Sequence, residues 1–146
     1  ANAEARERGS PSEIASILAR HANFSSVDQR GERNRAATVQ NGAGNASAIS
    51  QNGADQTASV RQTGDANTGT VRQFGRGNNA AIAQNGDNNN ACVIQFGRNL
   101  NTQVVQNGDN QSRGVVQTRT GSHDVSARAC DAHSPLMIVG TALYGR

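Results

Sequence analysis

The chain has 146 residues and a formal net charge of +3, with only 3% aromatic and 34% apolar residues. A chain of this length forms one domain at most, and its apolar content is too low to fill a thick globular core. There is also no apolar run of the length that a membrane-spanning helix needs.

Residues 1–22 form a polar N-terminal leader that begins at Ala1 without a hydrophobic segment. Such a start fits a mature secreted product whose signal peptide has been removed. Ser12 is a candidate N-cap for a short helix, because Ile14, Ile17 and Leu18 follow it at helical spacing. We therefore expect the leader to be partly flexible or to contain a helix over 12–21.

Residues 23–118 carry an unbroken eleven-residue repeat, with the consensus Q-x-G-x-x-N-x-A-x-V-x. Its first landmark is a glutamine: Gln29, Gln40, Gln51, Gln62, Gln73, Gln84, Gln95, Gln106 and Gln117. Two residues later comes a glycine: Gly31, Gly42, Gly53, Gly64, Gly75, Gly86, Gly97 and Gly108. A period held in phase over so many units predicts a repeat architecture.

Further positions complete each unit. Five residues after the glutamine stands Asn34, Asn45, Asn67, Asn78 or Asn89, with Gln56, Leu100 and Gln111 as exceptions. Nine residues after it, in seven of the units, stands Ile49, Val60, Val71, Ile82, Val93, Val104 or Val115. A small residue usually stands seven positions after the glutamine. The small residue, the β-branched residue and the next glutamine are spaced two positions apart, so they share one face of a strand.

The repeat predicts an all-β, two-sheet β-solenoid with one strand and one turn per unit. An eleven-residue period also occurs in right-handed coiled coils, but glycine and asparagine in every unit disfavour a long helix. The Gly-x-x-Asn segment instead has the composition of a sharp turn. Two units make a coil of twenty-two residues, so the repeat region holds about four to five coils.

The turn residues repeat every twenty-two positions, which supports two strands per coil. Asp65, Asp87 and Asp109 follow the glycine in alternate units, and Arg76 and Arg98 follow it in the others. We therefore expect one acidic and one basic edge. Stacked aspartates repel one another, so they are candidate gatekeepers that slow self-assembly. The alternative is that they are merely solvated turn residues.

Both ends of such a solenoid are expected to present unpaired strand edges. The repeat contains no proline, lysine or bulge signal to protect them. End-to-end strand addition would then give a filament with a cross-β core of Gln and Asn ladders and Val/Ile columns. If the leader or tail caps an end, the alternative is a monomeric solenoid adhesin.

Residues 119–146 are expected to form a degenerate last strand and an apolar C-terminal tail. Arg113 stands at an inward, small-residue position that the pattern does not explain. Cys92 is at an outward strand position and Cys130 lies in the tail. An intramolecular bridge requires the tail to fold back beside the sheet that carries Cys92; an intermolecular bridge or two free thiols are the alternatives.

The repeat resembles the curlin repeat of bacterial curli fibres, most clearly in the units from Gln40 to Gln51 and from Gln84 to Gln95. The resemblance covers residues 23–118. It implies a secreted structural subunit of a functional amyloid at the bacterial cell surface, with a role in biofilm matrix and adhesion. It also implies a related curlin subunit and dedicated secretion or chaperone factors as partners. The Arg/Glu-rich leader and Cys-containing tail leave both the major subunit and the minor, nucleating subunit open.

Other classes of function have little support in the sequence. No nucleophile elbow, phosphate loop or paired carboxylates occur, and the histidines lack metal-ligand spacing, so we expect no enzyme, cofactor or metal. All fourteen basic residues are arginines scattered along the chain, which disfavours nucleic acid as the primary partner. No regular column of exposed threonines is predicted, which disfavours ice binding.

Overall fold

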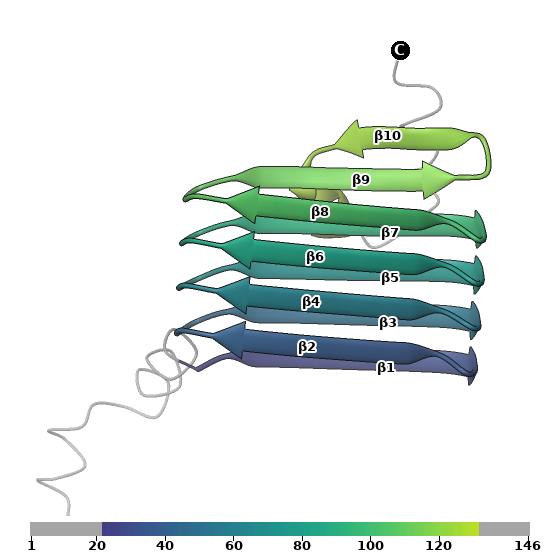
Figure 1. The fold of residues 1–146 in the computed structure, drawn as a ribbon, viewed down its shortest axis with the longest axis horizontal. Coiled ribbons are helices and arrows are strands. Elements are labelled where there is room, and N and C mark those ends of the chain that lie inside the picture. The colour runs from purple at the N-terminus through teal and green to yellow at the C-terminus, as the bar shows by residue number, and fades with distance from the viewer. Residues whose placement is uncertain (1–21, 132–146) are drawn as a thin grey trace, which may run out of the picture.

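A computed structural model describes residues 22–131 and shows a β-solenoid of two facing sheets (Figure 1). The chain winds between the sheets, so odd-numbered strands build one and even-numbered strands build the other. The first sheet contains β1 (Phe24–Glu32), β3 (Ala46–Ala54), β5 (Thr68–Arg76), β7 (Asn90–Arg98), β9 (Ser112–Thr118) and β10 (Gly121–Val125). The second contains β2 (Arg35–Asn41), β4 (Thr57–Thr63), β6 (Asn79–Asn85) and β8 (Asn101–Asn107).

Successive coils stack in parallel and in the register that the repeat predicts. Gln29 lies opposite Gln51, and Gln40 lies opposite Gln62, each a shift of twenty-two residues. The same shift holds for every parallel pair of strands up to β9. The prediction of a two-sheet solenoid with two strands per coil is confirmed.

The core between the sheets is thin and is filled by the β-branched and small positions of the repeat. Ile49, Val60, Val71, Ile82, Val93, Val104 and Val115 all lie in one buried cluster, together with Ala58, Ala80 and Ala91. The regular alternation of buried and exposed residues along β4, β6 and β8 is what places them there. The leader and the tail from residue 132 onward, including the helix expected over 12–21, lie outside the described residues.

The turns depend on the glycine but use asparagine differently from our expectation. Each repeat glycine has a positive φ, and a Cβ on Gly53 would meet the carbonyl oxygen of Gly75 at 1.8 Å. The second positive φ falls one residue before the consensus asparagine, for example at Gly44 or Asn88. The consensus asparagine itself is not in a left-handed conformation, so its role must be sought in its side chain.

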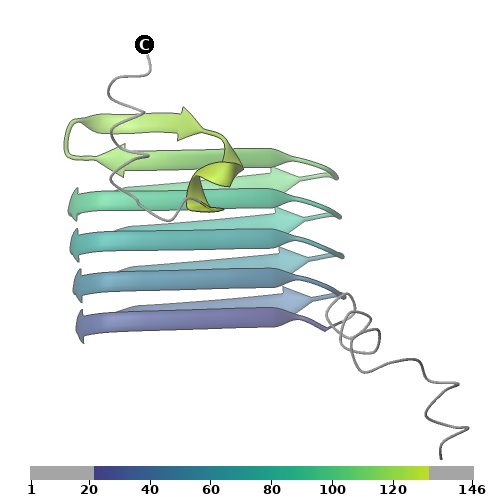
Figure 2. The ribbon, with the colours of Figure 1, turned by 180° about the vertical axis from the view of Figure 1, so that it is seen from behind.

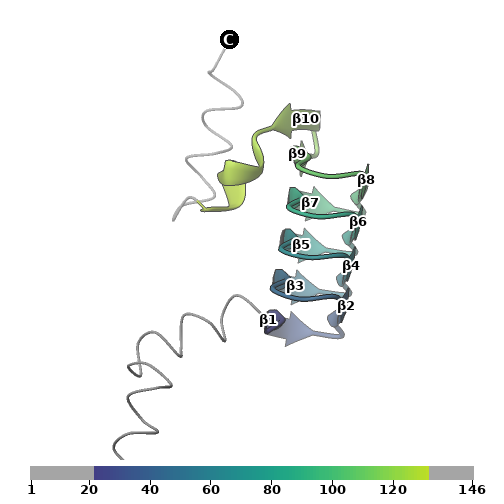
Figure 3. The ribbon, with the colours of Figure 1, turned by 90° about the vertical axis from the view of Figure 1, so that its left-hand side faces the viewer.

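The two ends of the solenoid differ, which corrects the expectation of two equivalent open ends. At the N-terminal end, β1 and β2 are the outermost strands, and no other described strand pairs with their outer edges. At the C-terminal end, the chain reverses after β9 and β10 pairs with it in antiparallel fashion. The 3₁₀ helix η1 (Ala127–Asp131) then lies on the outer face of the first sheet, away from the second sheet (Figures 2 and 3).

Candidate functional site: side-chain ladders and the two ends

Glutamine side chains form two continuous ladders along the solenoid axis. In each rung, Nε2 of one glutamine donates to Oε1 of the glutamine one coil further on, at 2.7–3.0 Å. One ladder contains Gln29, Gln51, Gln73, Gln95 and Gln117, and the other contains Gln40, Gln62, Gln84 and Gln106. The ladders therefore have a direction, with donors pointing toward the C-terminal end.

The same glutamines also tie the two sheets together. Gln84 Nε2 donates to the backbone carbonyl of Thr68 in the facing sheet at 2.9 Å, and Gln73 Nε2 does the same to Thr57. Both side chains are fully buried. Because a buried amide is costly unless its hydrogen-bonding groups are satisfied, the ladder explains why glutamine is required at this position.

The consensus asparagines hold the turns of adjacent coils together. Asn67 Nδ2 donates to the carbonyl of Gly86 at 2.8 Å, and its Oδ1 accepts the backbone N–H of Asn89 at 3.0 Å. The donor contact recurs for Asn34, Asn45, Asn78 and Asn89. The acceptor contact recurs for the same four residues. Asparagine therefore acts here as a staple between coils, a role that turn propensity did not predict.

Gln56 breaks this pattern, and the structure shows the consequence. It is buried at an asparagine position, and its Oε1 is the one buried side-chain oxygen or nitrogen without a hydrogen-bond partner in residues 22–131. An unpaired buried acceptor costs about 1–3 kcal/mol.

We expect Gln56→Asn to stabilise the chain by about 1 kcal/mol, since asparagine at this position can staple the turn as its neighbours do. Urea unfolding followed by circular dichroism measures the change. Asn67→Gln is the reverse control and should destabilise. Equal or lower stability of Gln56→Asn would contradict the role that we assign to the asparagines.

The predicted gatekeeper aspartates form a column at one turn edge, but they are more than solvated side chains. Oδ1 of Asp65 accepts the backbone N–H of Ala43 at 2.8 Å. Asp87 and Asp109 accept the backbone N–H of Asp65 and Asp87 in the same way and at the same distance. Each carboxylate thus caps the turn of the coil before it while stacking like charges along the edge.

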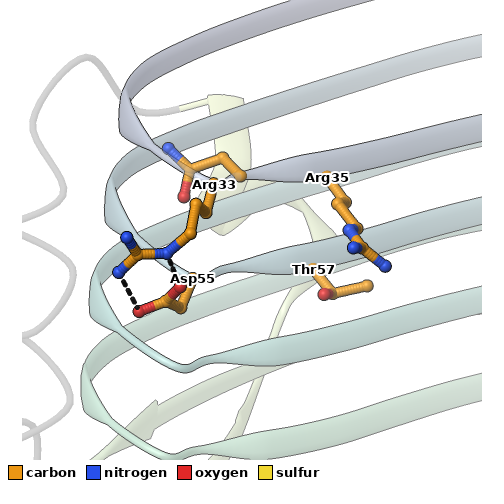
Figure 4. Close-up of a pocket in the computed structure, with 5 residues that line it drawn as sticks. Arg33, Arg35, Asp55 and Thr57 are labelled. Atoms are coloured by element: carbon orange, nitrogen blue, oxygen red, sulfur yellow. Dashed lines mark hydrogen bonds and ion pairs between the residues drawn. The ribbon is translucent and has the colours of Figure 1, made fainter.

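The opposite edge is not uniformly basic as predicted, because it also holds acidic residues. Asp55 lies between two arginines. Arg33 donates to its carboxylate in a bidentate pair (Figure 4), and Arg76 Nε lies 3.2 Å from Asp55 Oδ2. In addition, Arg33 Nη1 lies 3.8 Å from Glu32 Oε2. The cavity beside this pair has a volume of about 360 Å³ and is lined by Arg33, Asn34, Arg35, Asp55 and Thr57. The charges around Asp55 therefore partly compensate one another, while Arg98 adds a further positive charge to this edge.

The hydrogen bond from Arg33 is the main reason that the pKa of Asp55 falls from 3.8 to about 2. Because the folded-state pKa is lowered, the pair stabilises the fold fully above about pH 4. Its contribution is lost as the pH falls toward about 2. The pair is solvent-accessible, so its effect is small and salt-sensitive.

We expect the free energy of unfolding to fall more in the natural chain than in Asp55→Asn between about pH 4 and about pH 2. Asparagine tolerates the positive φ of 57° at this position, so the variant removes the charge without straining the turn. Urea unfolding at both pH values measures the difference. An equal fall in the free energy of unfolding in both proteins would contradict a stabilising role for the Arg33–Asp55 pair.

The N-terminal end continues the repeat pattern to its outermost strands. All residues of β1 are exposed, and Phe24, Val27 and Val39 are the large apolar side chains left open there. Gln29 and Gln40 begin the two glutamine ladders, so their Oε1 atoms face away from the stack. A further coil stacked on this end could therefore donate a hydrogen bond from a glutamine Nε2 to the Oε1 of Gln29 and of Gln40.

The C-terminal end departs from the repeat pattern, which explains how an arginine, Arg113, can stand at a position that is otherwise inward and small. Arg113 lies opposite the buried Ala91, as its inward position predicts. The second sheet ends at β8, so no described strand continues that sheet beyond β8 to cover Arg113, and the Arg113 side chain reaches solvent. Its Nη2 lies 3.7 Å from Asp124 Oδ1 on β10.

A disulfide between Cys92 and Cys130 fastens η1 to β7 and settles the alternatives left open for these residues. Around it lies a second small core of Cys92, Ile94, Val116, Ala127 and Cys130, all buried. Phe96 packs beside this core and stacks on Phe74, with ring centroids 4.6 Å apart. The tail does fold back on the sheet that carries Cys92.

The repeats also match a known family. A family model described as the curlin associated repeat matches residues 31–64 and 64–97. The match supports the curlin family for this part of the chain. A search of curated proteins found no match to the chain.

The two curlin matches together span the coils between Gly31 and Gly97. They end before β9, β10 and η1, so the closed end of the solenoid lies outside the matched repeats. Within residues 22–131, no helix is long and apolar enough to cross a membrane. The curlin match supports a curli-type amyloid subunit with a structural role.

Proposed function

We propose that this chain is a structural subunit of an extracellular, curli-like amyloid fibre that serves biofilm matrix and adhesion. It adds to its neighbours by strand pairing at the ends of the solenoid. The observation that carries the proposal is the open N-terminal end, where two exposed strands present the unfinished glutamine ladders in the register of the coils behind them. As the curlin resemblance suggests, a related subunit and secretion factors are the expected partners.

The winding of the chain defines how a neighbour would dock. After β8 and β9, the next repeat unit belongs beside β8 in the second sheet, and the one after it beside β9 in the first sheet. A second copy therefore places its β1 beside β8 and its β2 beside β9. In this position Gln106 and Gln117 donate to Gln29 and Gln40 of the second copy, and both ladders continue.

A terminal role in the fibre is the second candidate, and a specific observation favours it. β10 pairs with the edge of β9, so in this conformation one end of the first sheet is already occupied. A chain with one open end suits a subunit that starts or finishes a fibre, such as the minor, nucleating subunit. Closure of both ends would instead give the monomeric adhesin.

Seeded growth tests the proposed function. Freshly desalted chain is mixed with sonicated fragments of its own end product, once oxidised and once with dithiothreitol, and thioflavin fluorescence and electron microscopy follow assembly. We expect unbranched fibres with seeded kinetics in at least one of the two conditions. A stable, strand-rich monomer in both conditions would refute the proposal and favour the adhesin.

We further propose that the aspartate column slows assembly. Asp65→Asn, Asp87→Asn and Asp109→Asn together remove the stacked charges but keep an oxygen that can accept the same backbone N–H groups. We expect this triple variant to shorten the lag time at low salt, because like charges then no longer oppose stacking. The difference should shrink at high salt, where the charges are screened.

The matched control for the change in net charge is Glu4→Gln, Glu7→Gln and Glu13→Gln together, which removes three negative charges outside the repeat. An unchanged lag time in the triple aspartate variant at low salt would contradict the gatekeeper role.

A further inference from the structure

β10 occupies a position that the solenoid would otherwise offer to a neighbour. Its five residues pair with β9 from Gly121 opposite Thr118 to Val125 opposite Gly114. The winding of the repeats assigns this edge to the second strand of an added copy. While β10 is paired with β9, an incoming copy can pair only its first strand, beside β8. Its second strand finds the edge of β9 occupied, so the first coil of the added copy cannot form on this end.

The inner face of this end is charged where the repeat requires small side chains. Arg113 stands in the column of Ser25, Ser47, Gly69 and Ala91, and it pairs with Asp124 across β9 and β10. A strand added beside β8 would bury this ion pair against its own inward residues. Taking such a pair out of water is unfavourable, and inward-pointing charges are a known protection of sheet edges.

The outer face shows that the closure is specified by the sequence. One outward column of the first sheet reads Asp28, Ser50 and Arg72 and then changes to Ile94 and Val116. The two apolar members are buried beneath η1. The column is thus apolar only where the C-terminal segment covers it, and Cys130 bonds to Cys92 in the same patch.

We propose that β10 and η1, fastened by the Cys92–Cys130 disulfide, form a cap that makes assembly one-ended. With the disulfide intact, the chain accepts a neighbour at its N-terminal end only. The occupant of that end is a second copy of this chain whose own β10 has left β9. This inference rests on the proposed fibre function and adds to it which end grows and what controls the other.

Reduction of the disulfide is the event that frees the cap. A dithiol reductant supplies two electrons and two protons, the sulfur–sulfur bond breaks to give the Cys92 and Cys130 thiols, and the reductant closes to its own disulfide. The chain contains only these two cysteines, so a dithiol acts on no other bond in it. Elongation then scales with the fraction of chains whose C-terminal end is open.

The test compares the elongation rate of seeded, full-length chain with and without dithiothreitol. We expect reduction to raise the rate about tenfold or more, because the population with an open end rises. The double variant Cys92→Ala, Cys130→Ala should grow fast in both conditions, which separates release of the cap from other effects of the reductant.

A second variant opens the cap with the disulfide intact. His123→Pro places a residue without a backbone N–H in the middle of β10, where the side chain of His123 is exposed. We expect this variant to elongate faster than the natural chain under oxidising conditions. Circular dichroism of the monomer verifies that the coils remain folded.

The outcomes separate this inference from the function on which it rests. Fibres that grow equally fast oxidised and reduced, with His123→Pro unchanged, would overturn the cap and leave the fibre function standing. Growth in neither condition would overturn both. Slow oxidised growth that speeds up on reduction and in His123→Pro establishes the cap.

Discussion

Gly64→Ala should unfold or nearly unfold the solenoid, with an expected loss of about 4 kcal/mol in the free energy of unfolding. Its φ is +113°, a conformation that side chains rarely adopt. In addition, the new methyl group would lie 2.1 Å from the carbonyl oxygen of Gly86 in the next coil. Neither atom can move away without breaking the parallel register.

Gly108→Ala is the matched control, because its φ is +118° and the same backbone strain applies. No carbonyl of the described chain lies above it, and the added Cβ would meet only the Gln111 side-chain amide, at 3.0 Å. We expect a loss of about 1–3 kcal/mol from backbone strain alone. Equal losses in the two variants, measured by urea unfolding, would contradict close coil stacking as the reason for glycine.

Gly108→Ala also tests the docking geometry. In the proposed fibre, Gly31 of a second copy takes the place above Gly108, so its carbonyl would meet the new methyl group. The variant should therefore fold as a monomer but elongate slowly even when reduced. Normal elongation would mean that the second copy docks in another way.

Gln84→Leu has the second large expected effect. The substitution keeps the size of the side chain but removes the rungs to Gln62 and Gln106 and the bond to the Thr68 carbonyl. The acceptors on Gln106 and Thr68 are then left in the interior without their donor. We expect a loss of about 3–5 kcal/mol, since each unpaired buried group costs about 1–3 kcal/mol.

Gln29→Leu provides the comparison at the open end. Gln29 is exposed and donates to Gln51 alone among the described glutamines. We expect a loss of about 1–3 kcal/mol in the monomer, less than for Gln84→Leu, because only the Oε1 of the buried Gln51 loses its donor. Elongation should also be slower, because the ladder to the next copy is broken. Urea unfolding and seeded thioflavin kinetics measure the two effects. Equal destabilisation by the two glutamine variants would contradict the ladder account.

The regular part of the solenoid could be predicted from the sequence because each repeat position has one physical reason. Gln62 and Gln84 recur at a distance that only a twenty-two-residue coil turns into direct neighbours. The period-two pattern around Val60 and Ile82 fixes which face of the strand is buried. Local pattern and global fold agree in these units, which is the condition under which sequence reasoning succeeds.

The antiparallel reversal at the C-terminal end could not be predicted, although a last strand was expected there, because its residues have no counterpart in the repeats. The reversal after Thr118 depends on pairing between β9 and β10 that no periodicity indicates. One signal was present: Arg113 at an inward position indicates that the facing sheet ends there. Ile94 and Val116 at outward positions were a second signal of a covering segment that the pattern analysis did not use.

The stapling asparagines were expected both as ladder residues and as turn residues, but their side chains bond to the backbone of neighbouring coils rather than to one another. The positive φ angles fall instead on residues such as Asp55 and Ala66, which have no common identity. A sequence pattern gives the position of a side chain more reliably than its hydrogen-bond partners, because the partners come from the next coil.

The most direct test of the fibre account is the axial rise per subunit in fibres of this chain, measured by electron cryomicroscopy. Stacked solenoids predict a rise of about 20–25 Å, because each chain contributes four to five strand layers spaced about 4.8 Å apart. A rise of about 4.8 Å would mean that each chain lies flat in one layer. That result would contradict end-to-end addition of preformed solenoids and, with it, the role assigned to the two ends.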